Sequence, residues 1–241
     1  MKTNKYYESH IKCDVLEFLR KTKNIDARSV LASEYVLGST GRRADLAIFT
    51  GSKFIGIEIK SQHDSLSRLK DQLDVYAMCF DEVMVVLDGK HISYASEIAS
   101  ADVSVFEVSR LGTINLHRAS TVIPAKDKAT CLRLLTMNEL RRLTGLSDLQ
   151  MKKNKLIDQA LLLPDETIYS AITTSFKQNF SNTSLLFWEK IRRKNITIND
   201  LAYLSRFALE RTNFREKEEQ KSRFWEKWQQ DASSTLQALG H

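Results

Sequence analysis

The sequence predicts an α/β fold, a mixed β-sheet flanked by helices, followed by an all-α C-terminal region. Up to about residue 110, short apolar runs typical of strands alternate with stretches of helical periodicity. After about residue 125, only helical periodicity remains. Of the 241 residues, 42% are hydrophobic, which is enough for a packed core and excludes wholesale disorder. We therefore expect an α/β domain over residues 1–122 and a helical, basic region over residues 123–241.

The elements of the first domain follow from local patterns. Apolar side chains between Ile11 and Leu19 share one broad face of a helix. Residues 83–87 are continuously apolar, as in a strand that is buried on both faces. The strand–helix–strand order implies a crossover connection in a mixed sheet. In chain order we expect a helix at 6–21, strands at 29–37, 45–50 and 53–60, a helix at 65–80, a strand at 83–87, a helix at 93–99 and a strand at 103–108.

Helix signals organise the second region. Thr136 and Glu139 form a capping box that begins a helix, and Gly145 ends it. Pro164 ends the next helix. We expect helices at about 136–145, 155–163, 165–178, 184–194 and 198–236, the last with a charge run at 211–227. The tryptophans at helical spacing are expected to be core or interface residues rather than base-stacking ones; they are Trp188, Trp225 and Trp228.

Charge is unevenly distributed along the chain. The formal net charge is +6; residues 1–120 hold 16 basic and 16 acidic side chains, and residues 121–241 hold 20 and 14. A one-sided basic excess indicates a polyanionic partner. No apolar run approaches the roughly 18 residues of a membrane span, and the N-terminus lacks the apolar core of a signal peptide. The three widely spaced cysteines favour reduced, buried thiols, so we expect a cytoplasmic protein without membrane association.

A predicted β-hairpin carries the candidate chemistry. Gly51-Ser52 is typical of a two-residue type II′ turn, and centring the turn there makes the numbers of opposed residues sum to 103. Asp45 then lies opposite Glu58, and strand alternation puts Lys60 on the same face as Glu58. The other face is apolar. Opposed carboxylates need a compensating cation, and oxygen ligands of this kind suit Mg²⁺ or Mn²⁺.

Asp45 followed by Glu58-Ile59-Lys60, on a hairpin before a crossover helix, resembles the PD-(D/E)xK nuclease superfamily and, within it, the Sce7726-like bacterial and phage proteins. The similarity covers roughly residues 30–92. Ala44 stands where the superfamily name has proline. The resemblance implies a restriction-endonuclease-like core in which Asp45 and Glu58 bind the metal and Lys60 acts in catalysis.

The resemblance also implies a further acid near the metal. Glu34 is the first choice for this acid, with Glu8 and Glu17 as alternatives. Arg68, Gln72 and Tyr76 share one face of the crossover helix, on which Gln72 is a candidate catalytic residue and Arg68 a candidate DNA contact. A polar helix flank is an equally good interpretation of this face. Asp64 or Ser65 is expected to cap the helix N-terminus.

Two groups of basic residues are candidate DNA contacts. Arg42 and Arg43 precede the metal-binding strand, and guanidinium groups suit bidentate phosphate contacts, although exposed arginine pairs are common. Residues 134–162 resemble a SAP-type helix–loop–helix, a kind of module that binds duplex DNA. Residues 126–155, which we call the basic segment, hold eight basic and three acidic side chains. The candidate contacts in the basic segment are Arg141, Arg142, Lys152, Lys153 and Lys155.

Three functions remain in view. The first is a Mg²⁺- or Mn²⁺-dependent deoxyribonuclease that acts on DNA, with duplex DNA favoured and a phage or bacterial defence role. The second is a catalytically silent DNA-binding or regulatory protein, such as a phage or mobile-element factor. The third is a structural helical adaptor, which is disfavoured because the three catalytic positions are filled. A homodimer or a protein partner is compatible with each.

Overall fold

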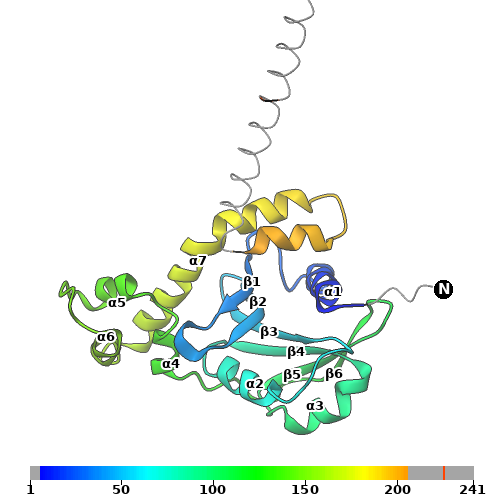
Figure 1. The fold of residues 1–241 in the computed structure, drawn as a ribbon, viewed down its shortest axis with the longest axis horizontal. Coiled ribbons are helices and arrows are strands. Elements are labelled where there is room, and N and C mark those ends of the chain that lie inside the picture. The colour runs from blue at the N-terminus through cyan, green and yellow to red at the C-terminus, as the bar shows by residue number, and fades with distance from the viewer. Residues whose placement is uncertain (1–5, 206–224, 226–241) are drawn as a thin grey trace, which may run out of the picture. The chain divides into compact units, whose positions relative to one another are not determined.

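The computed structural model describes residues 6–205 and Trp225, and its central feature is a six-stranded mixed β-sheet (Figure 1). The strands lie side by side in the order of the sequence. Pairing is antiparallel from β1 to β3, parallel from β3 to β5, and antiparallel between β5 and β6. This confirms the predicted α/β fold with a mixed sheet. The strands are β1 (Val30–Val36), β2 (Arg43–Phe49), β3 (Phe54–Lys60), β4 (Glu82–Asp88), β5 (Val103–Val108) and β6 (Ile114–Arg118).

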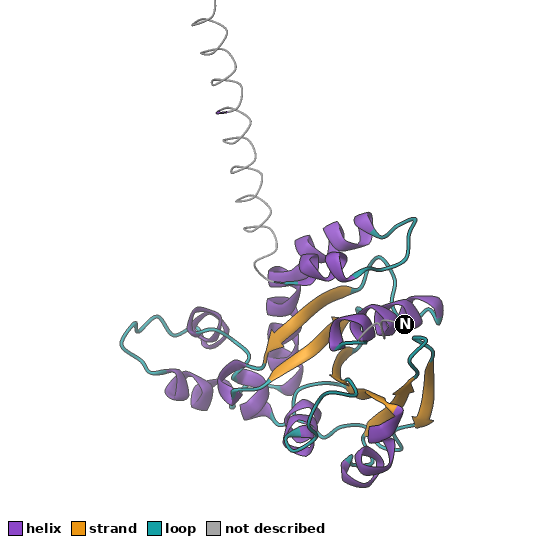
Figure 2. Cartoon of the chain, turned by 45° about the vertical axis from the view of Figure 1, so that its right-hand side comes forward, coloured by secondary structure: helices purple, strands orange, loops and turns teal. Residues whose placement is uncertain are grey.

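Helices cover both faces of the sheet (Figure 2). On one face, buried apolar residues of α1, the C-terminal part of α7 and η3 form a cluster with the strands. On the other face, α2 to α6 and the N-terminal part of α7 form a second cluster. The helices are α1 (Glu8–Lys21), η1 (Gly38–Thr40), α2 (Leu69–Ala77), η2 (Gly89–His91), α3 (Ile92–Ile98), α4 (Lys128–Leu132), α5 (Met137–Thr144), α6 (Lys153–Ala160), α7 (Asp165–Lys190) and η3 (Ile198–Leu204). Within residues 6–205, no helix combines the length and apolarity needed to cross a membrane.

The β2–β3 hairpin has the predicted register. Leu46 pairs with Ile57 and Phe49 with Phe54, so that opposed residues have numbers summing to 103. Thr50 donates its backbone N–H to Lys53, and Gly51 has a φ of 94°, a conformation that glycine adopts without strain. The apolar face lies in the cluster shared with α1, as expected. The turn and the burial pattern therefore agree on one register.

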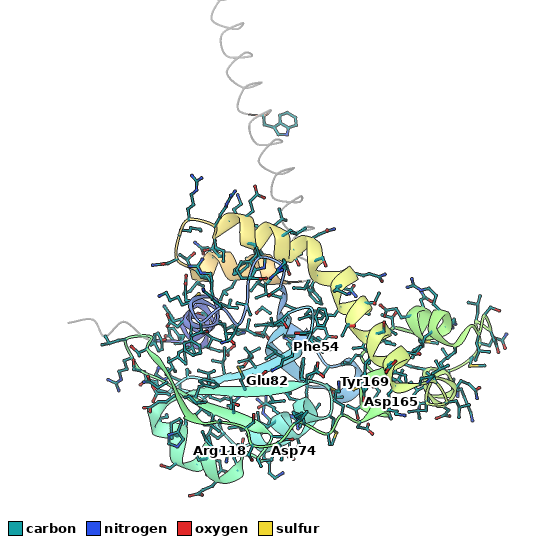
Figure 3. The ribbon with its side chains drawn as sticks, turned by 180° about the vertical axis from the view of Figure 1, so that it is seen from behind. Phe54, Asp74, Glu82, Arg118, Asp165 and Tyr169 are labelled. Atoms are coloured by element: carbon teal, nitrogen blue, oxygen red, sulfur yellow. The ribbon has the colours of Figure 1, made fainter. Side chains whose placement is uncertain are left out.

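The helical region shares a core with the sheet. Phe54 of β3 packs its ring 4.8 Å from that of Phe176 on α7 and 4.6 Å from that of Phe80, between centroids (Figure 3). Buried residues of α4, α5 and α6 belong to the same cluster. The sheet and these helices therefore bury one continuous apolar surface, while the domain boundary between residues 122 and 123 stays a prediction.

Two helix predictions were wrong in their extents. The crossover helix begins at Leu69 rather than at residue 65, with Arg68 as its N-cap. Asp64 instead accepts hydrogen bonds from the backbone N–H and hydroxyl of Ser61, so it closes the turn after β3. The helices predicted at 165–178 and 184–194 are one helix, α7. Polar residues in its middle lower helix propensity, but burial of Phe176, Phe180 and Phe187 outweighs this preference.

The sequence pattern missed the edge strand β6, whose exposed middle lacks the apolar alternation of a strand. Arg118 of β6 donates hydrogen bonds to four backbone carbonyls between Ser96 and Val103, which fixes the strand against the end of α3. Residues 198–204 form a 3₁₀ helix rather than the start of a long α-helix. The rest of the predicted helix to residue 236, its charge run at 211–227 and Trp228 lie outside the described residues.

Candidate cation site and basic segment

Two carboxylates meet across β1 and β2. Ser33 pairs with Leu46 and Tyr35 with Ala44, so Glu34 faces Asp45 between these pairs. Glu34 has a φ of 58°, which is uncommon for a residue other than glycine and costs roughly 1–3 kcal/mol, so the surrounding structure must hold it in place. The strained backbone keeps the Glu34 side chain beside Asp45.

A third carboxylate comes from the first turn of α1. Glu8, Glu34 and Asp45 each offer a ligand atom, and the three atoms lie within 4.8 Å of one another. We call these three residues the acidic cluster. The expected pair of Glu34 and Asp45 is thus brought together, and Glu8 joins them as one of the two alternative acids. Glu17, the other alternative, accepts hydrogen bonds from Arg20 and from the backbone of Ile196 instead.

Glu58 and Lys60 lie beside the acidic cluster as a separate buried ion pair. The Lys60 Nζ donates to Glu58 Oε1 at 2.5 Å, and the Tyr76 hydroxyl donates to Glu58 Oε2. The side chain of Glu58 is 1% exposed. Asp45 Oδ2 accepts the backbone N–H of Ile59 at 2.7 Å, which anchors β2 to β3 just beyond their last pair. The structure therefore brings the three predicted central residues together, with Glu58 already fully paired.

Lys12 on α1 places an ammonium group inside the acidic cluster. Its Nζ is 2.7 Å from Glu8 Oε1 and 3.8 Å from Asp45 Oδ1, and it donates a hydrogen bond to Glu34 Oε1. The Lys12 side chain is 6% exposed. All three carboxylates of the cluster therefore already contact one buried cation.

Burial dominates the electrostatics of the site. Desolvation, followed by repulsion from Glu58, raises the pKa of Asp45 well above its usual value. Desolvation also raises the pKa of Glu58, although Lys60 and Tyr76 oppose it. For Lys12, burial lowers the pKa, but Asp45 and the two glutamates of the cluster outweigh burial and raise it overall. Lys12 therefore stays charged, and its ammonium group favours the charged form of the carboxylates that it contacts.

The crossover helix contributes Tyr76 to the site. The Tyr76 hydroxyl has one proton to donate, and both Glu58 Oε2 and the backbone carbonyl oxygen of Arg43, 2.7 Å away, lie within hydrogen-bond distance of it, so Tyr76 connects α2 to both strands of the site. Arg68 is exposed and Gln72 is half-buried on the same helix. Of the predicted helix face, Tyr76 is thus the member with a hydrogen bond to the ion pair.

The arginines before β2 form ion pairs within the protein. Arg42 lies 3.2 Å from Asp71 on α2. Arg43 lies 3.4 Å from Glu34, and both of these side chains are about half exposed. Arg43 thus adds a second cation to the acidic cluster at its solvent side.

The basic segment divides into cations that brace it and cations that point to solvent. Arg141 donates to the backbone carbonyls of Asp148 and Leu149 and to Asn138, which holds the loop after α5. Lys153 donates to the backbone carbonyl of Arg133 at 3.0 Å, and burial lowers its pKa. Both are therefore occupied by contacts within the segment.

Three other cations of the basic segment are exposed: Arg142, Lys152 and Lys155. The predicted capping box at the start of α5, the helix that carries Arg142, is present, because Thr136 accepts the backbone N–H of Glu139 while Glu139 accepts that of Thr136. Gly145 ends α5 with a φ of 71°, as predicted. Within the basic segment, these three side chains are the exposed members of the predicted DNA-contact set, and Arg142 Nε also donates to the backbone carbonyl of Asn138 at 3.4 Å.

Sequence reasoning missed Lys12. The signal was available, since Lys12 lies four residues after Glu8 and interrupts the apolar run from Ile11 to Cys13 in a predicted amphipathic helix. A lysine on the buried face of a helix needs an anionic partner. The strand pattern placed two carboxylates and Lys60 on one face and led to the expectation of a metal ion, whereas the structure supplies Lys12 as a further cation of the protein itself.

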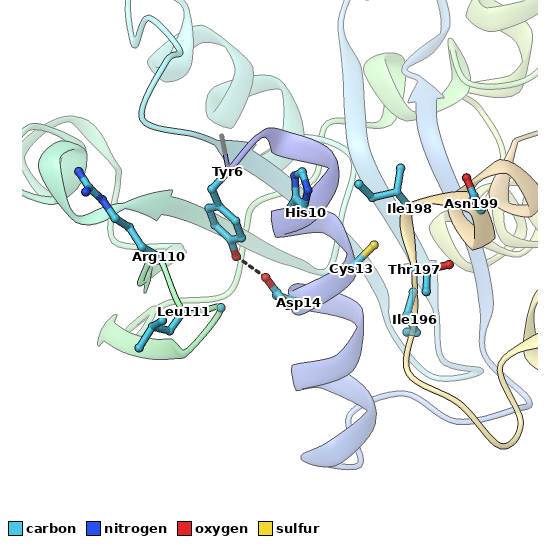
Figure 4. Close-up of a pocket in the computed structure, with 11 residues that line it drawn as sticks. Tyr6, His10, Cys13, Asp14, Arg110, Leu111, Ile196, Thr197, Ile198 and Asn199 are labelled. Carbon is cyan, nitrogen blue, oxygen red and sulfur yellow. Dashed lines mark hydrogen bonds between the residues drawn. The ribbon is translucent and has the colours of Figure 1, made fainter. Parts of the chain in front are cut away.

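A separate pocket of about 700 Å³ lies between α1, the β5–β6 turn and the segment that leads into η3 (Figure 4). Its lining includes Tyr6, whose hydroxyl donates to Asp14, together with His10, Cys13 and Arg110. Burial raises the pKa of the Cys13 thiol to about 12, so the thiol is protonated and unreactive at neutral pH. None of the acidic-cluster residues lines this pocket.

The chain is similar to proteins of a bacteriophage family. The model of the family described as "Bacteriophage P4 protein cII" matches residues 1–205. A relative named Protein cII, from Enterobacteria phage P4, is 31% identical over 207 residues, which cover 83% of this chain and 78% of the relative. No solved structure matches the chain significantly.

These matches correct the resemblance drawn from the motif. The assignment to the PD-(D/E)xK nuclease superfamily and its Sce7726-like branch, with the keywords nuclease and hydrolase, is overturned, because both sequence comparisons lead to the phage family instead. Short motifs such as Glu58-x-Lys60 are frequent in a chain with 27% charged residues, which is why three matching positions misassigned the family. The match over residues 1–205 spans the α/β sheet and the basic segment alike. By sequence, this chain belongs to the bacteriophage P4 protein cII family.

Proposed function

We propose that this protein is a phage DNA-binding protein that binds duplex DNA without cleaving it. The observation that carries the proposal is the set of exposed cations Arg142, Lys152 and Lys155 on a segment held rigid by its own arginine and lysine contacts. A preorganised basic surface loses little conformational entropy when it binds phosphates. The family relation to a protein of Enterobacteria phage P4 supports a phage or mobile-element factor.

The acidic site supports the absence of cleavage in this proposal. The acidic cluster and Glu58 are already paired with cations of the protein, namely Lys12, Lys60 and Arg43. Such a site contributes to the fold without an added metal ion. We place the protein in the cytoplasm, where its DNA partner and its three buried free cysteines both fit, and we retain a homodimer or a protein partner as part of the proposal.

Phosphate contacts by three side chains predict a definite salt dependence. With about three phosphates neutralised, the slope of log K against log salt is roughly −2.7 on duplex DNA. Binding is expected to be independent of sequence, because contacts to phosphates carry no information about the bases. A steep loss of affinity with salt is therefore the signature of this surface.

Fluorescence anisotropy with the full-length chain and a labelled duplex tests the proposal. Replacing Arg142, Lys152 and Lys155 together by glutamine is expected to weaken binding by at least about tenfold and to flatten the salt slope by about 2.7. The matched control replaces three exposed cations elsewhere, Lys21, Lys190 and Arg193, with the same change in net charge. Equal losses in the two triple variants, or no DNA binding by the wild-type protein, would refute the proposal.

A Mg²⁺- or Mn²⁺-dependent deoxyribonuclease activity is the second candidate function. The observation that favours it is Lys60, whose Nζ contacts Glu58 next to Asp45. The carboxylate oxygens of Asp45, Glu34 and Glu58 are of the kind that hold such an ion, which would supply an activated water for attack on a phosphodiester. In this function Lys60 orients the water and Tyr76 fixes Glu58.

A cleavage assay separates the two candidates. Linear, nicked and single-stranded DNA are incubated with the protein in Mg²⁺, in Mn²⁺ and in EDTA. Binding without cleavage under all conditions supports the silent protein. Cleavage that requires the metal and disappears in Asp45→Ala, Glu58→Ala and Lys60→Ala would establish the second candidate and overturn the first.

A further inference from the structure

Lys12 is an unusual residue for its place in the fold. It lies on α1 with the buried Ile11 and Cys13 on either side, and its own side chain is 6% exposed. A buried lysine without a counter-charge is strongly destabilising. Here the counter-charge is threefold, since Nζ meets Glu8, Glu34 and Asp45.

We propose that Lys12 is the resident cation of the acidic cluster and that its ammonium group keeps divalent metal ions out of this site. The inference deepens the proposed function and rests on it, because it explains why the site would not support cleavage. It makes Lys12 the residue that determines which cation the cluster accepts.

The Lys12 ammonium group occupies the space that a metal ion shared by the cluster would need. The three ligand atoms of the cluster lie within 4.8 Å of one another, so an ion that they share must lie between them. Mg²⁺ binds carboxylate oxygens at about 2.0–2.1 Å. The Lys12 Nζ lies within 4.0 Å of all three residues, at 2.7 Å and 3.8 Å from Glu8 and Asp45. The ammonium group and a shared metal ion therefore compete for the same place.

The three carboxylates also provide acceptors for the Lys12 ammonium group. An ammonium group has three donors and no acceptor, and three carboxylates surround this one. Displacing Nζ would separate a buried charge from the carboxylates that it contacts. A divalent ion must compensate for that displacement as well as for the loss of its own hydration shell, which Mg²⁺ gives up reluctantly.

Lys60, the other lysine near the site, contacts a different carboxylate. Its Nζ pairs with Glu58, which is not one of the three cluster residues. Removing the Lys60 charge would leave one carboxylate without its cation, whereas removing the Lys12 charge would leave Glu8 and Asp45 without theirs and Glu34 with Arg43 alone. The effect on metal binding is therefore expected to be specific to Lys12.

The test is a Mn²⁺ titration of the full-length protein, measured by calorimetry. Thermal unfolding with and without Mn²⁺ provides the second readout. Wild type is compared with Lys12→Met, which keeps the length and apolar stem of the side chain, and with Lys21→Met, a matched charge loss at an exposed position of the same helix. Wild type and Lys21→Met are expected to show no saturable binding below about 1 mM Mn²⁺. Lys12→Met is expected to bind at least about tenfold more tightly and to gain thermal stability with Mn²⁺.

The experiment still tests the inference if Lys12→Met is unstable. If it unfolds in EDTA and Mn²⁺ restores its folding, the inference is supported. Saturable Mn²⁺ binding by wild type that Asp45→Asn abolishes overturns it, as does a Lys12→Met protein that Mn²⁺ neither binds nor stabilises. DNA anisotropy on the same preparations tests the proposed function separately, so a protein that fails to bind DNA is distinguished from one in which Lys12 fails to exclude metal.

Discussion

The acidic cluster and the basic segment use charge in opposite ways. The cluster brings together carboxylates from α1, β1 and β2, and all three contact the buried ammonium group of Lys12. In the basic segment, Arg141 and Lys153 donate hydrogen bonds to backbone carbonyls of the segment itself. Arg142, Lys152 and Lys155 are exposed to solvent. Both regions gather side chains of like charge, so the number of charges does not distinguish them. Pairing within the protein decides which of these charges remain available to a partner. The contact that joins the two regions is therefore the first place to test.

Gly38 joins the two regions and is expected to be the most sensitive position. It has a φ of 58° in the loop after β1, and a Cβ there would lie 2.1 Å from the backbone oxygen of Arg133 in the basic segment. Gly38→Ala is expected to lower the free energy of unfolding by about 2–4 kcal/mol, because backbone must move on both sides. Urea unfolding measures the loss.

Gly41 is the matched control for this substitution. It belongs to the same loop and has a φ of 71°, but a Cβ there meets nothing within 4 Å. Gly41→Ala is therefore expected to cost only the backbone strain, about 1 kcal/mol. Similar losses for the two variants would show that the contact between loop and basic segment contributes nothing to stability.

Tyr76→Phe is expected to have the next largest effect, confined to the acidic side. Its single hydroxyl lies within hydrogen-bond distance of the buried Glu58 and of the backbone carbonyl of Arg43, and the substitution removes the donor that these two acceptors share. We expect a loss of about 1–3 kcal/mol in the free energy of unfolding. Tyr94→Phe, at an exposed tyrosine, is expected to stay within about 0.5 kcal/mol of wild type. A Tyr76→Phe protein as stable as this control would mean that the hydrogen bonds do not hold α2 to the strands.

The sequence could predict the features that local signals determine, but not those that depend on long-range packing. The β2–β3 register and the strand pairing followed from Gly51 and from alternation, which are local signals, and they placed Asp45 beside Glu58 correctly. The approach of Glu8 and Lys12 depends on how α1 packs on the sheet, and strand periodicity contains no information about that packing. The strained backbone of Glu34 was likewise beyond any local pattern.

Helix ends show the same limit. The capping box at Thr136 and the glycine cap at Gly145 were predictable because side chains three to nine residues apart determine them. The continuity of α7 was not, because buried phenylalanines that meet the sheet decide it. The family assignment from the hairpin motif was wrong for a related reason: a site of three residues is too short to identify a family that the match over residues 1–205 does identify.

Within the basic segment, Arg141 and Arg142 are expected to differ in kind. Arg141→Gln removes hydrogen bonds to the loop at Asp148 and Leu149 and is expected to destabilise the protein by about 1 kcal/mol. Arg142→Gln is expected to leave stability within about 0.5 kcal/mol while weakening DNA binding. Thermal unfolding and anisotropy on both variants measure the two effects. The reverse assignment, with Arg142 affecting stability and Arg141 only affinity, would contradict the division into bracing and exposed cations.

The smallest expected effect is a difference in pH response between the two regions. Burial raises the pKa of Glu139, but hydrogen bonds from Ser175 and Thr136 outweigh it, and the pKa is lower in the folded protein than in the unfolded chain. A lowered carboxyl pKa contributes stability above the unfolded value, and this contribution is lost as the pH falls through the folded value. In Asp45 and Glu58 the folded pKa is raised, so their protonation on mild acidification favours the folded state.

Glu139→Gln isolates the response of the basic segment. At pH 7 the variant is expected to be less stable than wild type by about 0.5–1 kcal/mol, because a neutral amide makes weaker capping hydrogen bonds than a carboxylate. As the pH falls below about 4, wild type loses the same contribution and the two unfolding curves converge. Urea unfolding of both proteins over this pH range measures the convergence. A difference that stays constant with pH would mean that the charge of Glu139 does not stabilise the segment, and that only the shape of its side chain matters to the cap.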